Sequence, residues 1–421
     1  MEGGSLTVDS RDELAARLDA CQKCNVCTAQ CPVAKVNPHF IGPKGLGPDM
    51  ERFRMGQITL GETTLDECSN CKTCEVTCPS GVKITEMIIG ARRTASKAPH
   101  KNMMGLKLRL RGYVLGRAEY LGKLGVIWPT MTNQVLKIKL VRLALDKALS
   151  ISKNGPLPPY AKPLEVQVDK SRRIGASASK QVIYFPGCYT RYNEADTGRV
   201  IIKVLEHVGY KTIVPDFHCC GLPLEANGQF EKALKNGLNN LELMGPYLEA
   251  GMPIITSCTS CGLTLKEDYP KLQTTSAQLI GAQSYDLFEF LWQLSEKGEL
   301  PLDFQEVKAS YGYHSPCHLK AQGIGTPALR ILRLIPGVKI RNLDAGCCGL
   351  SGSYGFKAEK YDKAMKIGST LFEAINVGAG RGDFQGMTTE CGVCKVQIQH
   401  GTGIPTEHPV RILAKAYRLI N

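Results

Sequence analysis

The sequence predicts a multidomain α+β fold, in which a helical N-terminal domain precedes two repeated α/β subdomains. Three observations lead to this prediction. The chain has 421 residues, which is more than one domain of roughly 150 residues accounts for. Its 18 cysteines fall into four short groups with none left over, and the last two groups repeat together with their flanking residues. Apolar residues make up 43% and charged residues 22% of the chain, which excludes a disordered protein.

The N-terminal residues and the hydropathy of the chain predict a cytoplasmic protein. Residues 1–20 carry Asp9, Asp12, Glu13 and Asp19 and lack the apolar segment of a secretory leader. No run approaches the roughly 18 apolar residues that a membrane-spanning helix needs. In a reducing compartment, cysteines serve metal or redox chemistry rather than a disulfide framework. The cysteines therefore predict metal centres.

The first two cysteine groups share the spacing C-x2-C-x2-C-x3-C-P, which ligates [4Fe-4S] clusters in two-cluster ferredoxins. The two-residue gaps allow three thiolates of one loop to reach three irons, while the fourth cysteine serves the other cluster. A tetrahedral zinc site would explain one C-x2-C pair but not two identical runs. We therefore assign Cys21, Cys24, Cys27 and Cys78 to cluster 1, and Cys68, Cys71, Cys74 and Cys31 to cluster 2.

Helices are expected around these two groups, and we assign residues 1–100 to a helical ferredoxin domain. The exchange of fourth ligands requires the chain between the two groups to fold back, and residues 36–56 are rich in Gly and Pro before becoming helix-like. Residues 82–95 have the apolar spacing of a helix. Neither stretch has the alternation of a strand pair, so we expect a helical domain rather than a βαββαβ domain.

Residues 101–165 form a predicted basic connector. Residues 92–148 contain 13 Lys or Arg but only Glu119 and Asp146 as acids, which gives a net charge of +11. Apolar residues recur there with helical spacing, and Trp128 separates two such stretches. Basic amphipathic helices dock on anionic membranes or acidic partners, and a solvated connector helix is the simpler alternative. We expect docking, and no nucleic acid, because no recognition motif accompanies the charge.

The third and fourth cysteine groups predict two Cys-Cys-Gly subdomains, at residues 180–300 and 308–421. Matching cysteines of the two copies are 128 to 133 residues apart. In each copy a strand-like run leads into the first cysteine and into the final C-x2-C, with helix-like segments between them. This alternation predicts small parallel sheets with cysteines at strand ends. The first copy contains Cys188, Cys219, Cys220, Cys258 and Cys261, and the second contains Cys317, Cys347, Cys348, Cys391 and Cys394.

Five cysteines in each copy exceed the four ligands of a cubane cluster, so one is redundant or the cluster is not a cubane. We expect one or two further clusters in these repeats. The glycine after each Cys-Cys pair permits a backbone φ that other residues rarely adopt. We expect His218, His314 and His318 to hydrogen-bond backbone or thiolate groups rather than ligate a metal. The charged residues 266–268 are expected on a solvated helix face.

The glycine-rich segments of the chain do not form a nucleotide fingerprint, because neither G-x-G-x-x-G nor G-x4-G-K-[ST] is present. A redox protein without such a motif is expected to lack a flavin of its own. It would then exchange electrons with a partner protein.

These motifs resemble those of the iron–sulfur C subunits of anaerobic glycerol-3-phosphate dehydrogenases, over nearly the whole chain. Outside the cysteine spacing, the resemblance rests on the sequences CPVAKVNPHFIGPKGLGPDMERFR, CCGLPLEANGQF, YGYHSPCH, CCGLSGSYGFK and EHPVRILA. The cysteine pattern is also similar to that of a wider superfamily, which includes iron–sulfur subunits of glycolate and lactate oxidases and the D subunits of heterodisulfide reductases.

The resemblance implies an electron-transfer subunit of a quinone-linked dehydrogenase in anaerobic respiration. A flavoprotein partner would oxidise sn-glycerol 3-phosphate to dihydroxyacetone phosphate. This subunit would pass the electrons to a membrane quinone and tether the complex to the cytoplasmic face of the inner membrane. Both copies keep all five cysteines, as do heterodisulfide reductases whose Cys-Cys-Gly motifs hold non-cubane [4Fe-4S] clusters. The alternatives are therefore a catalytic disulfide reductase, or the iron–sulfur subunit of a glycolate or lactate oxidase.

Overall fold

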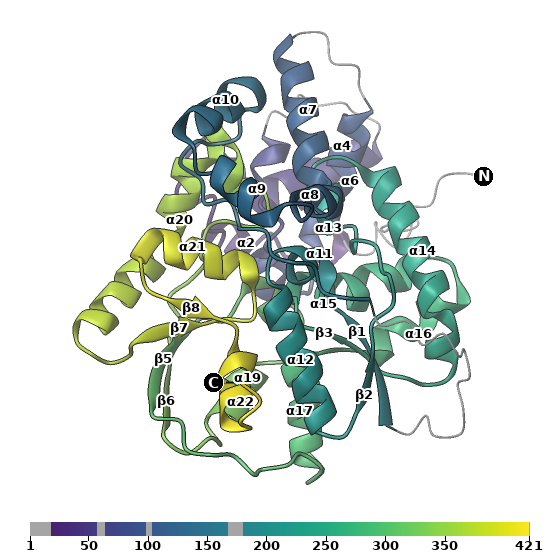
Figure 1. Cartoon of the computed structure of the whole chain (residues 1–421). Coiled ribbons are helices and arrows are strands. Elements are labelled where there is room, and N and C mark those ends of the chain that lie inside the picture. Colours follow the sequence, from purple (N-terminus) through teal and green to yellow (C-terminus); the bar gives the residue numbers. More distant parts are fainter. Residues whose placement is uncertain (1–17, 57–63, 98–102, 167–179, 421) are drawn as a thin grey trace.

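The computed structural model describes residues 18–56, 64–97, 103–166 and 180–420, and two four-stranded parallel sheets carry the two repeats. The first sheet has the strand order β2-β1-β3-β4 and the second has the order β6-β5-β7-β8. Equivalent strands thus occupy equivalent places, which confirms the predicted repeat of small parallel sheets. The two sheets lie side by side in the lower half of Figure 1.

The elements of the two repeats follow the predicted alternation. The strands are β1 (Gln181–Phe185), β2 (Lys211–Ile213), β3 (Ile254–Thr256), β4 (Ser284–Asp286), β5 (Ala309–Tyr313), β6 (Val338–Asn342), β7 (Gly386–Thr388) and β8 (Thr406–Glu407). The first repeat has the helices α11 (Gly187–Tyr192), α12 (Ala195–His207), α13 (Leu222–Glu225), α14 (Phe230–Glu249), α15 (Thr259–Leu263), η4 (Thr264–Asp268), η5 (Tyr269–Lys271), α16 (Thr275–Gln283) and α17 (Leu287–Glu296). The second repeat has α18 (Cys317–Ala321), α19 (Pro327–Leu332), η6 (Tyr354–Phe356), α20 (Ala358–Gly380), α21 (Gly392–Thr402) and α22 (Pro409–Ala416).

The two repeats share one hydrophobic core. Figure 1 shows α12, α17, α19 and α22 between the two sheets, where α12 packs on α22 and α17 packs on α19. Leu205 and Leu291 of the first repeat and Ile331 and Leu413 of the second are fully buried in the same group of side chains. Burying apolar surface between the repeats stabilises both, so the two repeats form one packed unit rather than two independent domains.

The ferredoxin domain is helical, and the described residues between 18 and 97 contain no strand. This agrees with the prediction. Its core includes the buried side chains of Leu46, Ile84 and Ile88, and Tyr354 and Ala364 of the second repeat pack into the same core. The domain therefore docks on η6 and α20 of the second repeat. Its helices are α2 (Val26–Ala29), α3 (Gly42–Lys44), η1 (Gly45–Asp49), α4 (Met50–Met55), η2 (Leu65–Glu67), α5 (Thr73–Val76) and α6 (Ile84–Ser96).

The basic connector forms four helices at the top of the molecule in Figure 1, namely α7 (Met103–Gly116), α8 (Ala118–Gly125), α9 (Pro129–Val135) and α10 (Lys139–Leu149). Pro129 begins α9, as is common for the first turn of a helix. None of the helices in the described residues combines the length and hydrophobicity required to cross a bilayer.

The connector packs on both repeats. The Ser152 N–H donates to the Phe356 carbonyl at 2.8 Å, and the Ala358 N–H donates to the Ser150 carbonyl at 2.8 Å. On the other side, Gly122 lies so close to Tyr192 that an added Cβ would be 2.4 Å from its ring. These contacts fix α8 against the first repeat and the end of α10 against the second, so the connector is not a solvated linker.

Candidate iron–sulfur sites

The two ferredoxin loops have the same backbone shape around the second cysteine of each group. Lys23 and Asn25 flank Cys24 with φ values of 57° and 65°, and Asn70 and Lys72 flank Cys71 with values of 54° and 57°. Left-handed backbone is uncommon for residues other than glycine and is kept mainly where surrounding structure requires it. In these loops it turns successive cysteines toward one side. The sequence pattern predicts the spacing of the cysteines, whereas this shared strain is visible only in the structure.

The first thiol group joins three cysteines of one loop with the last cysteine of the other. A small cavity of about 20 Å³ is lined by all four, Cys21, Cys24, Cys27 and Cys78. Burial raises the pKa of Cys27, and the charges of Cys78 and Cys21 raise it further. The Val82 N–H donates to the Cys78 sulfur at 3.4 Å, which fixes the fourth thiol. The structure thus places these residues in the group predicted for cluster 1.

The second thiol group contains the reciprocal exchange. Burial raises the pKa of Cys74, and the nearby charges of Cys71, Cys68 and Cys31 raise it further. The Asn70 N–H donates to the Cys68 sulfur at 3.5 Å. These four thiols are those predicted for cluster 2. Thiolates held this close in a buried space would repel one another, and the irons of a bound iron–sulfur cluster would relieve that repulsion.

All five cysteines of the first repeat meet at the carboxyl ends of β1 and β3. The Cys219 and Cys188 sulfurs are 3.8 Å apart. Contacts with Cys220 and Cys258, together with burial, raise the pKa of Cys261 well above its ordinary value. Gly187 leaves room for this group, because an added Cβ would lie 2.7 Å from the Cys261 sulfur.

The second repeat forms the equivalent group at the ends of β5 and β7. The Cys348 and Cys394 sulfurs are 3.2 Å apart, and contacts with the Cys317 and Cys348 thiols hold the pKa of Cys347 well below its ordinary value. The pKa of Cys348 is raised by its contact with Cys347, by burial and by the charge of Cys391. The turn depends on Gly349, which has a φ of 89°.

His314 differs from the other two predicted histidines. One of its ring nitrogens and the sulfurs of Cys348 and Cys394 lie within 4.8 Å of one another. Burial lowers the pKa of His314 to about 4, which keeps the ring neutral and able to bind a metal. The sequence favoured a hydrogen-bonding role for this residue, and the geometry makes it a possible ligand as well.

The cluster 2 loop faces the second repeat. Burial raises the pKa of Cys71 to about 12, and the charge of Cys347 adds to this effect. The charge of Cys71 also contributes to the raised pKa of Cys317. Helices α5 and α18, which carry these loops, are in contact. The order of thiol groups is therefore cluster 1, cluster 2 and then the second repeat.

His318 joins three of the four cysteine regions. Its Nε2 lies 2.9 Å from the carbonyl of Asn70 in the cluster 2 loop, and its Nδ1 lies 2.8 Å from the hydroxyl of Ser260 in the first repeat. Burial lowers the pKa of His318, so the ring is neutral. Since a carbonyl can only accept, Nε2–H donates to Asn70, and Nδ1 accepts from Ser260. This is the hydrogen-bonding role that the sequence predicted.

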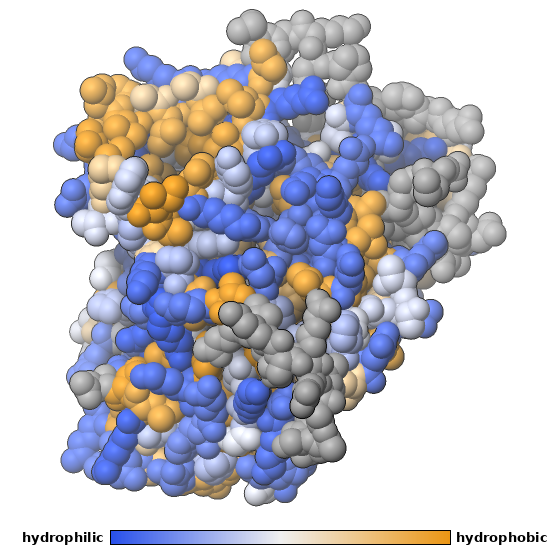
Figure 2. Space-filling model, turned by 45° about the vertical axis from the view of Figure 1, so that its right-hand side comes forward, coloured by the Kyte–Doolittle hydropathy of each residue, from blue (hydrophilic) through white to orange (hydrophobic). Residues whose placement is uncertain are grey.

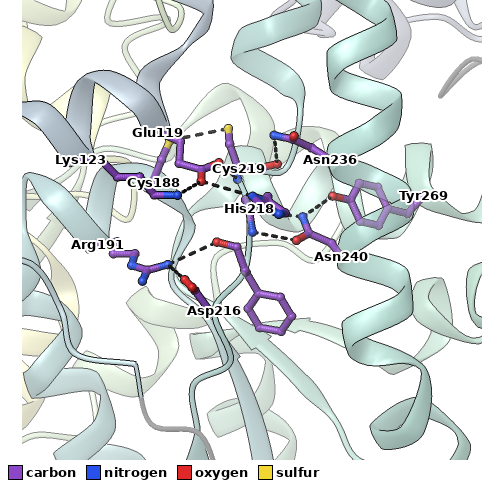
Figure 3. Close-up of polar contacts among 11 residues, drawn as sticks. Glu119, Lys123, Cys188, Arg191, Asp216, His218, Cys219, Asn236, Asn240 and Tyr269 are labelled. Atoms are coloured by element: carbon purple, nitrogen blue, oxygen red, sulfur yellow. Dashed lines mark hydrogen bonds and ion pairs between the residues drawn. The ribbon is translucent and has the colours of Figure 1, made fainter.

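Glu119 of α8 lies at the Cys-Cys turn of the first repeat, as Figure 3 shows. Its carboxylate accepts the Cys219 N–H at 2.8 Å and lies 3.3 Å from Nδ1 of His218. Burial alone would raise the pKa of Glu119, but Lys123 and the Cys219 N–H outweigh it and hold the pKa below its ordinary value. Asn240 fixes the same turn by accepting the His218 N–H at 2.9 Å. The sequence analysis did not single out Glu119 as a site residue, although it is one of two acids in the basic segment.

The charged residues 266–268 are not on a solvated helix face, so this prediction was wrong. They lie in the π-helical turn η4, where Asp268 is buried and Glu267 pairs with Lys72 of the ferredoxin loop at 2.6 Å. Lys266 pairs with Glu289. Sequence spacing cannot reveal such partners, because the paired residues come from distant parts of the chain.

Comparisons with known proteins agree with this architecture. Residues 17–82 match the 4Fe-4S dicluster domain family, and residues 182–266 and 311–399 match the Cysteine-rich domain family. The chain is 35% identical over 400 residues to the C subunit of the anaerobic glycerol-3-phosphate dehydrogenase of Escherichia coli (strain K12), and the match covers 94% of this chain and 98% of that protein.

More distant relatives also match over most of their length. The chain is 25% identical to the glycolate oxidase iron–sulfur subunit of Escherichia coli (strain K12), over 86% of each protein. It is 23% identical to the D subunit of the dihydromethanophenazine:CoB–CoM heterodisulfide reductase of Methanosarcina barkeri, over 98% of each.

Together, the matched domains and the grouped thiols identify an iron–sulfur electron-transfer protein that holds multiple clusters. The relatives are named as subunits of oxidoreductases. The level and extent of identity then decide among the relatives. The chain belongs to the family of the C subunits of anaerobic glycerol-3-phosphate dehydrogenases.

Proposed function

We propose that this chain carries electrons from a flavoprotein that oxidises sn-glycerol 3-phosphate to a membrane quinone. The observation that carries the proposal is the serial order of the thiol groups. Cluster 1 is followed by cluster 2, cluster 2 faces the second repeat through Cys71 and Cys347, and His318 bridges the second repeat to Ser260 of the first. The first repeat in turn contacts the connector through Glu119.

The proposal assigns a ligand set to each group. Bound iron–sulfur clusters supply one-electron carriers at these positions, and the protein holds them in order and buries most of the thiols. The sets are Cys21, Cys24, Cys27 and Cys78; Cys31, Cys68, Cys71 and Cys74; Cys188, Cys219, Cys220, Cys258 and Cys261; and Cys317, Cys347, Cys348, Cys391 and Cys394.

We infer that the connector docks the protein on an anionic membrane, at its cytoplasmic face. Figure 2 shows a hydrophobic area near the top of the molecule, at the level of α7–α10 in Figure 1. Trp128 is 66% exposed, and Leu140, which directly follows Lys139 in α10, is 74% exposed. Exposed apolar side chains next to lysines and arginines favour the membrane interface. The exposed large apolar residues of these helices and the turns between them are Met104, Leu106, Leu108, Leu110, Tyr113, Tyr120, Leu124, Ile127, Trp128, Met131, Val135, Ile138, Leu140 and Leu143.

The proposal is tested by isolating the native complex anaerobically from membranes. We expect a flavoprotein partner and quinone reduction driven by glycerol 3-phosphate. In the same complex, Cys348→Ser should abolish quinone reduction, while electron transfer from the flavoprotein to a soluble dye continues. Full quinone reduction by this variant, or a complex without a flavoprotein, would contradict the proposed route.

A second function is favoured by one observation, namely that each of the two repeats brings all five of its thiols together. Heterodisulfide reduction adds two electrons and two protons to a disulfide and releases two thiols. Under this function, the complex would reduce a disulfide with an artificial electron donor, and Cys348→Ser would abolish that activity. A complex that reduces quinone with glycerol 3-phosphate but leaves disulfides intact excludes it.

A further inference from the structure

A cavity of about 640 Å³ opens on the connector, between α9, α10 and the segment 153–159. It is separate from the thiol groups, because no cysteine lines it. Its described lining contains no acidic residue and combines four cations with apolar side chains. The residues that matter here are Lys137, Lys139, Lys153, Arg142, Leu143 and Leu157.

Arg142 forms the buried cationic part of this cavity. Its guanidinium donates to the carbonyls of Ser152 at 2.8 Å and Lys153 at 3.1 Å, and also to the carbonyl of Gly155. Within the described residues, no carboxylate is within ion-pair distance of it. The charge of Asp146 acts on Arg142 without a direct ion pair, and a buried cation whose direct partners are carbonyl dipoles favours an anion close by.

The three lysines that line the cavity add positive charge, and no described carboxylate pairs with them. Lys137, Lys139 and Lys153 are exposed, and none makes an ion pair with another described residue. The nearest acid on α10, Asp146, accepts the backbone N–H of Lys153 at 3.1 Å. The potential at the cavity is therefore positive and suits a phosphate group.

Apolar side chains next to the cavity distinguish an amphiphile from a soluble anion. Ile138 lies between two lining lysines and is 50% exposed, and Leu140 follows Lys139 and is 74% exposed. Leu143 lines the cavity and is itself exposed. A soluble phosphate would leave these groups in water, whereas lipid acyl chains would bury them.

We propose that this cavity binds the phosphate-bearing headgroup of an anionic phospholipid, with α9 and α10 contacting its acyl chains. The lysines and Arg142 face the phosphate, since ammonium and guanidinium groups are the usual phosphate donors of proteins. The inference rests on the membrane docking proposed above and gives that docking one defined lipid site.

The test compares two variants that lose the same charge. One replaces the cavity lysines (Lys137→Gln, Lys139→Gln and Lys153→Gln), and its matched control replaces connector cations outside the cavity (Lys107→Gln, Arg109→Gln and Lys147→Gln). The native complex is floated with vesicles that contain phosphatidylglycerol or only phosphatidylcholine. If only diffuse electrostatic attraction holds the protein on the vesicles, both variants should lose the same amount of binding affinity. The lipid site predicts that the cavity variant loses about tenfold more affinity for phosphatidylglycerol vesicles than the control.

Each outcome has a separate meaning. Equal losses in the two variants would overturn the lipid site and leave membrane docking in place. No binding of the unaltered complex to phosphatidylglycerol vesicles would overturn both. Competition identifies the source of the phosphate: dihexanoylphosphatidylglycerol should release the complex from vesicles at concentrations where inorganic phosphate does not, and equal competition would overturn the lipid site. Unchanged iron content in both variants shows that they are folded, and native mass spectrometry should detect phosphatidylglycerol retained by the unaltered protein but not by the cavity variant.

Discussion

Glu119 illustrates how one side chain links two parts of the molecule. It belongs to the basic connector, yet its carboxylate accepts the N–H of Cys219 and approaches His218. An acid in a basic segment is a visible sequence signal. Its target is not visible, because Glu119 and Cys219 are 100 residues apart in the chain.

We predict that Glu119→Gln raises the reduction potential of a cluster bound in the first repeat. The change removes a negative charge beside the thiol group but retains an acceptor for the Cys219 N–H, so the turn should keep its shape. Redox titration followed by electron paramagnetic resonance measures the shift. Asp216→Asn is the control, because Asp216 is an exposed acid near the same repeat. Unchanged potentials in Glu119→Gln would rule out this electrostatic role.

The burial of Asp286 predicts that the stability of the protein depends on pH. Its Oδ1 accepts the Phe288 N–H at 2.9 Å, whereas its buried Oδ2 lacks a partner among the described residues. Burial raises the pKa of Asp286 from its ordinary value of 3.8 to about 7. The folded state then holds the proton more tightly, so this contribution to stability is complete below about pH 4 and is lost as the pH rises through about 7.

Asp286→Asn should therefore stabilise the protein at pH 8, by on the order of 2 kcal/mol, and the gain should shrink toward pH 5. The amide keeps the acceptor for Phe288 and has no charge to bury. Thermal unfolding midpoints across this pH range measure the effect, with the exposed Asp362→Asn as the control. A lower midpoint for Asp286→Asn at pH 8 would show that the charged form is needed.

At the scale of elements, strands and their adjoining cysteines were predictable, and the local backbone was not. The runs that became β1, β3, β5 and β7 lead directly into cysteines, and β-branched or aromatic residues mark several of them. The leucines at 106, 108 and 110 lie in a helix as expected, but their spacing of two residues distributes them around α7 rather than along one face. The π-helical turns η1 and η4 have no simple sequence signature, because tertiary packing selects them.

The Cys-Cys turn of the second repeat depends on glycine for two reasons. Gly349 has a φ of 89°, which costs other residues about 1–2 kcal/mol, and an added Cβ would lie 2.0 Å from the Ala364 carbonyl on α20. We predict that Gly349→Ala lowers the iron and acid-labile sulfide bound per chain. Gly346→Ala is the matched control, because Gly346 also has a positive φ but an added Cβ meets no atom within 4 Å. Equal losses from both variants would assign the effect to φ alone.

At the scale of the whole molecule, the arrangement of the parts could not be predicted from the sequence. The exchange of fourth cysteines followed from the C-x2-C-x2-C-x3-C-P pattern, so the content of each ferredoxin group was accessible. The docking of the ferredoxin domain was not, because it depends on pairs such as Lys72 with Glu267 and Lys271 with Glu86. Charged residues of this kind occur throughout the chain, and spacing does not select their partners.

A substitution of Lys360 would test how the ferredoxin domain docks on the second repeat. The Lys360 side chain is 1% exposed, and its ammonium lies 2.8 Å from Glu67 and 3.0 Å from Asp66, just before the cluster 2 loop. Lys360→Met leaves Glu67, whose side chain is only 13% exposed, with Lys363 as its remaining ion-pair partner, which should destabilise the docked domain by about 3 kcal/mol. Hydrogen exchange of residues 64–68 and the thermal midpoint measure it. Lys363→Met removes a more exposed partner of Glu67 and should cost less than about 1 kcal/mol. Similar effects of the two variants would refute this role for Lys360.

The helices between the sheets relate the two repeats by an internal symmetry. By position after their strands, α12 corresponds to α19 and α17 corresponds to α22, so the contacts α12–α22 and α17–α19 are the same contact seen twice. This is the isologous relation of a twofold-symmetric dimer. The two repeats of one chain thus pack on each other as the subunits of such a dimer do. Their thiol groups nevertheless have different neighbours: those of the second repeat lie next to the cluster 2 loop, and the Cys-Cys turn of the first lies next to the connector.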